Sequence, residues 1–338
     1  MSELRRDLTT DRWVIIAPER GRRPRDEPPQ SRPAARALPF DPACPFCPGN
    51  ESQLPGIIAE MRSARNPGWR TRVVLNKFPA VSQDVLHCKH GSMFYETAAG
   101  QGYHEVVIES PRHDHDLTTM SEREVCDVLA ACRSRYEALT TEGSVQSVIV
   151  FRNRGTIAGA SLRHPHSQVI ALDIVPPLVR ARQAAMLRYY QSNGHCAVCD
   201  IIDHERNDGS RTVTENDAFV TVVPFAANTR CEMWILPKRH EADFGNPRGG
   251  EIELLAIALR DALVRLAAAL DDPPYNYIVD TAAKGGALLP HLHWALRIVP
   301  QLTLPAGFEL GSGLLINPSL PEEDAAILRS FRPVPKET

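Results

Sequence analysis

His-Pro-His-Ser-Gln-Val-Ile-Ala-Leu-Asp-Ile-Val-Pro occupies residues 164–176, and a related run, His-Leu-His-Trp-Ala-Leu-Arg-Ile-Val-Pro, occupies residues 291–300. Each run begins with a His-x-His pair and ends on Ile-Val-Pro after an apolar segment. A Cys-x-x-Cys pair precedes each run, at 44–47 and at 196–199. Because the same features return once in the same order, the sequence indicates an internal duplication.

Short apolar runs and helix signals have the same order in both halves. Ser121 followed by Glu124 is a capping box, which opens a helix that we expect to reach about Leu139. We predict further helices at 178–191, stopping near Gly194, and at about 250–270. Strands are predicted at 73–75, 104–108, 147–153, 168–172, 218–223, 232–236, 275–279 and 293–299. Antiparallel sheets with one long helix per half give an α+β architecture with domains 1–181 and 182–338.

The bulk composition limits the classes of function. The 338 residues carry a net charge of −3, so no global basic field is present to hold nucleic acid, and an anionic ligand must be bound by local groups. Residues 1–11 are charged and lack the apolar core of a signal peptide. The apolar stretch 252–270 is interrupted by charged residues, so it does not read as a membrane span. We therefore expect a cytoplasmic protein without a membrane or nucleic-acid partner.

The first cysteine pair is typical of a zinc site. Cys44 and Cys47 can bind one ion from a tight turn, and zinc prefers four soft or borderline ligands in a tetrahedron. The alternatives are a redox pair or two buried thiols. The spacing leaves the remaining ligands open among His113, His115, His164 and His166.

The second cysteine pair invites the same interpretation. Cys196 and Cys199 are followed by three candidate histidines, which are His240, His291 and His293. The repeat places His291 opposite His164, so this histidine remains an alternative to His293.

The His-x-His pair at 164–166 is the strongest candidate for catalysis. On a strand, His164, His166 and Gln168 share one face, so one histidine can bind a metal while the next faces a substrate. A neutral imidazole, with an ordinary pKa of about 6.5, is a good nucleophile towards phosphorus near neutral pH. Gln168 can donate a hydrogen bond to a phosphate oxygen. A loop containing Gly155 and Gly159 precedes the pair and weakens the alternative, in which these residues serve only the metal or the surface.

Five further polar residues are candidate ligand contacts. Arg20 and Arg23 can clamp a phosphate or a base edge, although a solvated loop has the same composition. Asn76 follows a predicted strand and either reaches a ligand or forms a turn. Asn153 and Ser161 flank the glycine-containing loop, as turn formers or as phosphate donors.

Taken together and in order, several segments resemble the galactose-1-phosphate uridylyltransferase family, a branch of the histidine triad superfamily. These segments are 11–18, 44–47, 76–80, 151–155 and 164–168. The resemblance implies two histidine-triad-like halves, each an antiparallel sheet with a long helix, usually paired as a homodimer. The segments 272–277 and 308–313 resemble the plant ADP-glucose phosphorylases more closely.

The resemblance also implies a role for each candidate residue. It makes His166 the nucleophile, with phosphate or ribose contacts from Gln168, Asn153, Ser161 and Asn76, and nucleotide contacts from Arg20 and Arg23. It implies a first zinc site of Cys44, Cys47, His115 and His164, and a second of Cys196, Cys199, His240 and His293. Zinc is expected to be structural, because four protein ligands leave no open position for water.

The implied mechanism is a ping-pong transfer. His166 attacks the α-phosphorus of a nucleoside diphosphate sugar, a hexose 1-phosphate leaves, and a second acceptor takes the nucleotide. The first expectation is exchange of UMP between UDP-glucose and galactose 1-phosphate. The near alternative is an ADP-glucose phosphorylase, in which phosphate is the acceptor. Two more distant alternatives are a hydrolase of the same superfamily and a zinc-organised nucleic-acid-binding module.

Overall fold

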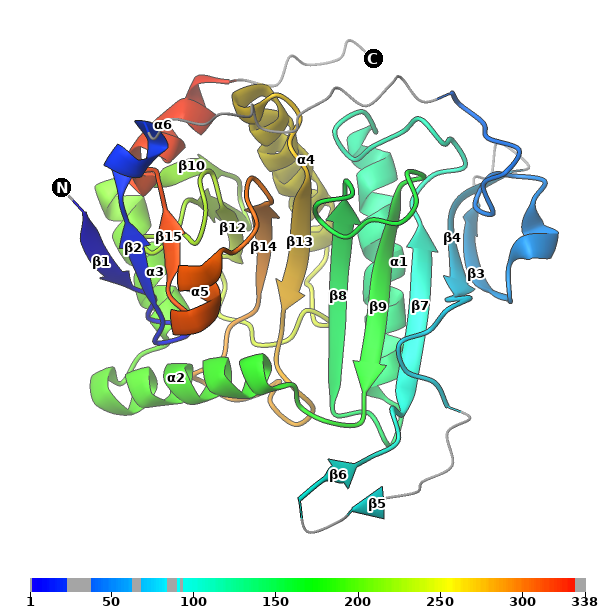
Figure 1. The fold of residues 1–338 in the computed structure, drawn as a ribbon, viewed down its shortest axis with the longest axis horizontal. Coiled ribbons are helices and arrows are strands. Elements are labelled where there is room, and N and C mark those ends of the chain that lie inside the picture. Colours follow the sequence, from blue (N-terminus) through cyan, green and yellow to red (C-terminus); the bar gives the residue numbers. More distant parts are fainter. Residues whose placement is uncertain (1, 23–37, 63–67, 84–89, 92–93, 332–338) are drawn as a thin grey trace.

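The computed structural model describes residues 2–22, 38–62, 68–83, 90–91 and 94–331, which are built around one large sheet (Figure 1). Its strands are β3 (Ile57–Arg62), β4 (Trp69–Leu75), β7 (Gly102–Ile108), β8 (Ser147–Arg154), β9 (His166–Leu172), β10 (Thr212–Glu215), β11 (Phe219–Val222), β12 (Met233–Pro237), β13 (Tyr275–Asp280) and β14 (Ala295–Pro300). They lie in the order β10-β11-β12-β14-β13-β8-β9-β7-β4-β3. Every neighbouring pair is antiparallel.

The strand order displays the duplication that the sequence indicates. β13 and β8 are neighbours at the middle of the sheet, with Tyr277 opposite Arg152, and five strands extend on each side in matching order. The sequence predicted a sheet in each half; the two sheets join at this seam into a continuous one. The antiparallel α+β fold with one long helix per half is confirmed.

Two long helices cover one face of the sheet. α1 (Glu122–Thr140) and α4 (Glu251–Leu270) lie behind the strands in Figure 1 and pack against each other. Their buried side chains, among them Leu129 and Leu259, form one apolar core with the back of β7, β8, β9, β13 and β14. Burial of each such leucine contributes about 2 kcal/mol of hydrophobic free energy. On the opposite face, two smaller apolar clusters cover parts of the sheet, one around the first cysteine pair and one around the second.

The remaining helices are shorter or peripheral. α2 (Pro177–Asn193) ends, as expected, at Gly194, whose φ of 78° is left-handed. The others are α3 (Ala197–Asp208), α5 (Gly307–Ser312), α6 (Pro321–Ser330), and the 3-10 turns η1 (Pro18–Arg22) and η2 (Glu51–Gln53). α3, which starts at the second cysteine pair, was not among the predicted helices. Within the described residues, no helix combines the length and apolar character that crossing a membrane requires.

A small second sheet joins the two ends of the chain. β1 (Glu3–Arg6) pairs with β2 (Trp13–Ile16), and β15 (Leu315–Asn317) runs parallel to β2. The two-stranded β5 (His90–Gly91) and β6 (Glu96–Thr97) form a separate projection. The first strands of the chain thus lie with its last elements, and the division at 181/182 stays a prediction.

The capping box of α1 offers a test of the local sequence signal. Ser121 Oγ accepts the Glu124 backbone N–H at 3.3 Å, and Glu124 Oε2 accepts the Ser121 N–H at 2.8 Å. We expect Ser121→Ala to lower the free energy of unfolding by about 1 kcal/mol, because it removes the acceptor for a helix N-terminal N–H. Denaturant unfolding measures this, and Ser121→Thr, which keeps the hydroxyl, is the control. An unchanged midpoint for the alanine variant would contradict the role of the cap.

Candidate active site

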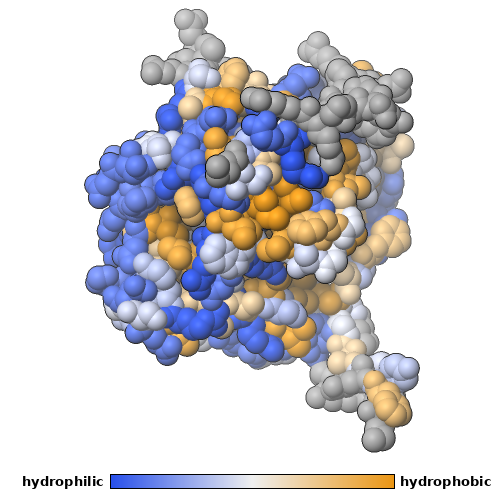
Figure 2. All heavy atoms as spheres, turned by 60° about the vertical axis from the view of Figure 1, so that its left-hand side comes forward, coloured by the Kyte–Doolittle hydropathy of each residue, from blue (hydrophilic) through white to orange (hydrophobic). Residues whose placement is uncertain are grey.

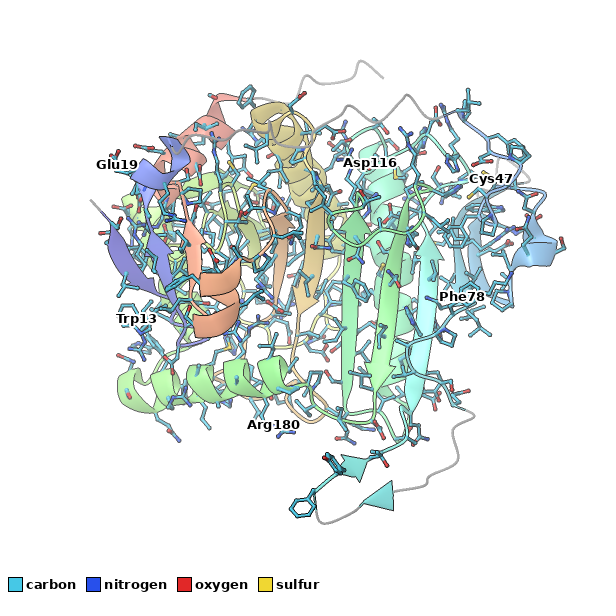
Figure 3. All side chains as sticks on the ribbon, in the orientation of Figure 1. Trp13, Glu19, Cys47, Phe78, Asp116 and Arg180 are labelled. Carbon is cyan, nitrogen blue, oxygen red and sulfur yellow. The ribbon has the colours of Figure 1, made fainter. Side chains whose placement is uncertain are left out.

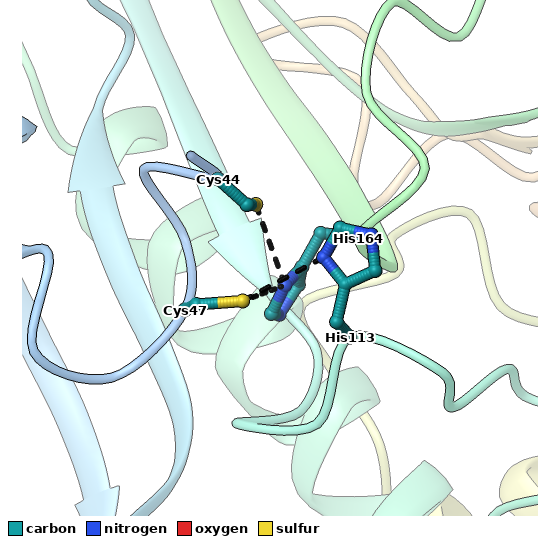
Figure 4. A group of neighbouring side chains, drawn as sticks. All are labelled: Cys44, Cys47, His113 and His164. Carbon is teal, nitrogen blue, oxygen red and sulfur yellow. Dashed lines mark hydrogen bonds between the residues drawn. The ribbon is translucent and has the colours of Figure 1, made fainter. Parts of the chain in front are cut away.

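Two thiols and two imidazoles meet at one end of the sheet (Figure 4). Cys44 Sγ lies 3.7 Å from His164 Nδ1, and Cys47 Sγ lies 3.6 Å from both His164 Nδ1 and His113 Nδ1. The four residues are buried, and their ligand atoms lie within 4.8 Å of one another. Two sulfur and two nitrogen donors at such separations fit the tetrahedral coordination of zinc.

Backbone hydrogen bonds hold this group in a binding geometry. The Cys47 N–H donates to the Cys44 carbonyl at 3.2 Å, which closes the turn between the two thiols. His164 donates from Nε2 to the Ser110 carbonyl at 2.7 Å, so its Nδ1 lone pair points to the sulfurs. Burial raises the pKa of Cys44 and lowers the pKa of His164 to about 4. The imidazole is thus neutral, as a ligand must be, and a bound cation would offset the cost of a buried thiolate.

His113 takes the place that the resemblance assigned to His115, which corrects that expectation. The His113 N–H donates to the Pro39 carbonyl at 2.9 Å, which holds this residue in the turn beside the thiols. His115, two positions on, points instead to Ser110 Oγ at 3.2 Å and towards Glu124. Cysteine and histidine spacing alone could not separate the two, because both lie in one irregular turn.

A second group of the same composition lies in the other half. Cys199 Sγ is 3.4 Å from His240 Nδ1 and 3.5 Å from His293 Nδ1, and Cys196 Sγ is 3.8 Å from His293 Nδ1. His293 Nε2 donates to the Pro237 carbonyl at 3.0 Å, as His164 does to Ser110. His291 lies outside the group, against the Tyr190 ring.

The register of the two halves is therefore shifted from the one that the sequence suggested. β9 starts at His166, two residues after the metal-group histidine His164, and β14 starts at Ala295, two residues after His293. His293, and not His291, corresponds to His164. The counterpart of His166 in the second half is an alanine, so only the first half carries an imidazole at this position.

His166 has the geometry of a nucleophile. Its Nδ1 donates to the His164 carbonyl at 2.9 Å, so in the neutral ring the lone pair is on Nε2. Burial lowers the pKa of His166, which favours the neutral form. The ring packs edge-on against Phe46 and lines a cleft of about 1760 Å³. The residue is 7% exposed, so little of the ring is open to solvent.

The cleft runs from His166 to the second half of the chain. Asn153 and Ser161, two of the predicted ligand contacts, line it, and so do Arg230 and Gln301 from the second half. The other predicted contacts lie elsewhere. Gln168 is on the same strand face as His166 but beyond the cleft lining, Asn76 lies beside it, and Arg20 is exposed in η1. Arg23 falls outside the described residues.

The glycine-containing loop is fixed by the second half. Gly155 has φ of 84°, and a Cβ on it would stand 2.8 Å from Pro274. Asn276 of β13 donates from Nδ2 to Asn153 Oδ1 at 2.8 Å and to the Ala158 carbonyl at 2.9 Å. Both halves thus shape the wall of the cleft that His166 lines.

A buried polar network lies behind β9 and was not predicted from the sequence. Arg152, fully buried, donates from Nε to Glu109 Oε1 at 2.9 Å and from Nη1 to the Tyr275 hydroxyl at 2.7 Å. Ser167 Oγ donates to Glu109 Oε1 at 2.6 Å and lies 2.5 Å from the Tyr277 hydroxyl. These bonds fix the strand that carries His166 from behind. The available signal was Arg152 in the 151–155 segment, because a charge inside an apolar strand needs a partner.

Two salt bridges tie this network to the surface. Asp116 accepts from Arg152 at 3.4 Å and from Arg154 Nε at 3.0 Å. Figure 3 shows Asp116 at the upper end of the sheet, the end at which Cys47 also lies. Both arginines hold the pKa of the Asp116 carboxyl below its usual range, although burial opposes them.

Comparisons with known proteins agree with this geometry. A family model for the galactose-1-phosphate uridyl transferase N-terminal domain matches residues 1–176. The chain is 36% identical to the ADP-glucose phosphorylase of Arabidopsis thaliana over 97% of its own length and 92% of the relative's. It is 26% identical to the galactose-1-phosphate uridylyltransferase of Thermotoga maritima, covering 97% and 98% of the two chains.

Solved structures give the same result. The crystal structure of the Arabidopsis thaliana ADP-glucose phosphorylase with bound ADP-glucose superposes with a TM-score of 0.84 at 34% identity, covering 98% of this chain and 99% of that one. A structure of a uridylyltransferase has a TM-score of 0.76 at 29% identity, with 98% of each chain covered.

The choice between His113 and His115 can be tested by metal content. We expect His113→Ala to lower bound zinc by about one equivalent and to lower the melting temperature, because a four-coordinate structural site loses a ligand. His115→Ala, the matched control two residues away, should keep its metal. Elemental analysis of the purified variants measures this. Loss of zinc from the His115 variant alone would return the ligand to that residue.

Proposed function

The chain belongs to the galactose-1-phosphate uridylyltransferase family and is a nucleotidyltransferase, and we propose that it transfers a nucleoside monophosphate from a nucleotide sugar through a covalent bond to His166. The observation that supports this is the hydrogen bond from His166 Nδ1 to the His164 carbonyl, which leaves Nε2 as a lone-pair donor at the end of a cleft. Imidazoles presented in this way attack phosphorus.

The transfer proceeds in two successive displacements at the same phosphorus. His166 Nε2 bonds to the α-phosphorus of a nucleoside diphosphate sugar, the bond to the bridging oxygen breaks, and a hexose 1-phosphate leaves with the electron pair. The ring retains its Nδ1 proton and becomes positively charged, and the His164 carbonyl, which accepts that proton in a hydrogen bond, stabilises the charge. An acceptor oxygen then attacks the same phosphorus and releases neutral His166.

We propose ADP-glucose as the donor and phosphate as the acceptor. The similarity to the plant ADP-glucose phosphorylase supports this order, because it covers almost the whole chain at a higher identity than the similarity to the uridylyltransferase of Thermotoga maritima. Transfer of UMP between UDP-glucose and galactose 1-phosphate, the first expectation from the sequence, is the second candidate, supported by the family model over residues 1–176.

The ligand contacts follow from this chemistry. We propose that Gln168, Asn153 and Ser161 donate hydrogen bonds to the phosphoryl oxygens, where negative charge accumulates during transfer. As the family resemblance implies, we propose a phosphate or ribose contact for Asn76 and nucleotide contacts for Arg20 and Arg23.

Both Cys2His2 groups are compatible with zinc, and we propose that they bind it structurally. A zinc ion held by these four-residue groups would anchor His164 and, in the second half, His293, and would serve a structural role. Because His164 also holds His166 through its carbonyl, the first group positions the nucleophile without taking part in the transfer.

We further propose a homodimer. Large apolar side chains such as Leu304 and Leu310 are more than two-thirds exposed, and Figure 2 shows hydrophobic residues gathered near the middle of one face. Exposed apolar area of this kind commonly marks a protein interface. We also propose the division of the chain into domains 1–181 and 182–338.

Intact-mass measurement tests the covalent step. After mixing with ADP-glucose, we expect the wild-type protein to gain one adenylyl group and His166→Ala to gain none, since the attacking nitrogen is gone. Zinc content and melting temperature of the variant should match the wild type, which separates chemistry from folding. An adduct on His166→Ala would remove the nucleophile from this position.

The donor and the acceptor are tested in the same way. We expect ADP-glucose to label the protein, and phosphate to remove the label as ADP. Labelling by UDP-glucose only, with removal by galactose 1-phosphate, would select the second candidate. Release of free monophosphate without an added acceptor would identify a hydrolase.

A further inference from the structure

His104 lies next to the proposed phosphate donor Gln168 and belongs to none of the groups described so far. It stands on β7, and its Nε2 lies 2.8 Å from Gln168 Oε1 on the neighbouring strand β9. It is half-buried, on the same face of the sheet as His166. Any effect of His104 on the transfer therefore runs through Gln168, and this inference rests on the proposed function.

The backbone fixes which nitrogen of His104 carries the proton. The Ala80 N–H points at Nδ1 at 3.0 Å, and a backbone N–H can only donate. Nδ1 is therefore the acceptor, and the neutral ring has its hydrogen on Nε2. This Nε2–H faces Gln168 Oε1, an acceptor, so the two partners are complementary.

The tautomer in turn orients the Gln168 amide. With its oxygen held by His104, the Gln168 side chain turns its NH2 group away from the imidazole. Rotating the amide by a half-turn would set two donors against each other and leave a hydrogen bond unmade, which costs about 1–3 kcal/mol when the groups are shielded from water. Within the described residues no acceptor takes these NH2 hydrogens, so they remain available to a ligand.

The amide of Asn76, like that of Gln168, has its oxygen engaged in a hydrogen bond. Its Oδ1 accepts the Phe78 N–H at 2.8 Å, which sets its NH2 group on the side of His104, 3.0 Å from Nε2. Because the hydrogen on Nε2 is donated to Gln168 Oε1, Nε2 cannot accept from this NH2 group, which lies beside the ring without donating to it. Two amide donors thus flank the His104 ring with their oxygens already engaged.

The position relative to His166 makes this orientation useful. His166 and Gln168 are alternate residues of one strand, so their side chains stand about 7 Å apart on one face. A phosphoryl group bonded to His166 Nε2 carries its oxygens into this gap, where an NH2 donor attracts them and a carbonyl oxygen repels them. The sense of the Gln168 amide therefore decides whether it helps or opposes the transfer.

The second half of the chain provides an internal comparison. Trp234 pairs with Arg297 as Val106 pairs with Gln168, so Glu232 corresponds to His104 and Arg297 to Gln168. Glu232 is fully buried and accepts from Trp234 Nε1 and from Asn228. The half with alanine in place of His166 thus also lacks the histidine–glutamine pair.

We propose that His104 is a positioning residue for nucleotidyl transfer, whose Nε2–H holds Gln168 with its amide NH2 turned towards the phosphoryl group on His166. His104 touches neither substrate nor the reacting atoms in this arrangement. It acts by selecting one of two amide orientations before the substrate arrives, which removes a cost that the transition state would otherwise bear.

A kinetic double-mutant cycle tests the route through Gln168. The measured quantity is the rate constant for adduct formation with ADP-glucose in a single turnover. We expect His104→Leu to lower it by about 10- to 100-fold, the effect of a misplaced group near the reacting atoms. In a Gln168→Ala background, His104→Leu should have no further effect, because the group that it positions is absent. Multiplied effects in the double variant would overturn the proposal.

A conservative variant and a packing control complete the kinetic test. His104→Gln keeps a side-chain N–H near the position of Nε2, so it should restore most of the rate lost in His104→Leu. Ile170→Ala removes apolar volume directly across the ladder from His104, and its rate should stay near that of the wild type. A loss in this control as large as in His104→Leu would assign the effect to packing and overturn the proposal.

Nitrogen NMR of the histidine rings gives a readout independent of activity. In protein labelled with 15N-histidine, the ring signal that disappears in His104→Gln should show the Nε2–H tautomer at neutral pH. A proton on Nδ1 would overturn the proposal.

The outcomes also separate this inference from the proposed function. A wild-type protein that no nucleotide sugar labels would remove the proposed function and this inference with it. A labelled wild-type protein whose Gln168→Ala variant is slow while His104→Leu is fast would leave the function intact and overturn only the role of His104.

Discussion

One residue, His164, links the metal group to the candidate nucleophile. Its ring faces two thiols through Nδ1 and is anchored by Nε2 to the Ser110 carbonyl, while its own carbonyl accepts the proton of His166 Nδ1. A shift of this residue would therefore disturb both the ligand geometry and the tautomer of His166. In the proposed function, this dependence would let a structural ion held by His164 position the nucleophile without contact with the reacting atoms.

The large sheet converts that local arrangement into a rigid one. Behind β9, Glu109 is paired with the buried Arg152 and also accepts a hydrogen bond from Ser167, the residue between His166 and Gln168. A buried ion pair contributes little net stability, but its hydrogen bonds define a single position for the strand. Asn276 of the second half holds the loop around Ala158, part of which lines the same cleft as His166. The second half, which lacks the imidazole, still serves as part of the active-site wall.

The sequence predicted the features of the fold and the site that depend on residues close together in the chain. Features that depend on contacts between distant segments could not be predicted. The capping box at Ser121, the stop at Gly194 and the two Cys-x-x-Cys pairs depend on neighbours in the chain, and they lie in the structure as expected. The placement of His113 instead of His115 depends on the Pro39 carbonyl, more than 70 residues away, which no spacing rule contains. The role of Arg152 was hidden for the same reason, because its partners come from other strands. The register between the halves was misjudged because both His-x-His pairs look alike in one dimension.

The pairing of β2 with β15 has a consequence for how the protein is made. Val14 and Ile16 are covered in the folded protein, in part by Leu315, yet residues 315–317 must be synthesised before that cover exists. During translation, β1 and β2 therefore expose apolar side chains and an unpaired strand edge. Surfaces of this kind promote aggregation of nascent chains or recruit chaperones. Closure of the small sheet is thus a late event, which can follow only the synthesis of residues 315–317.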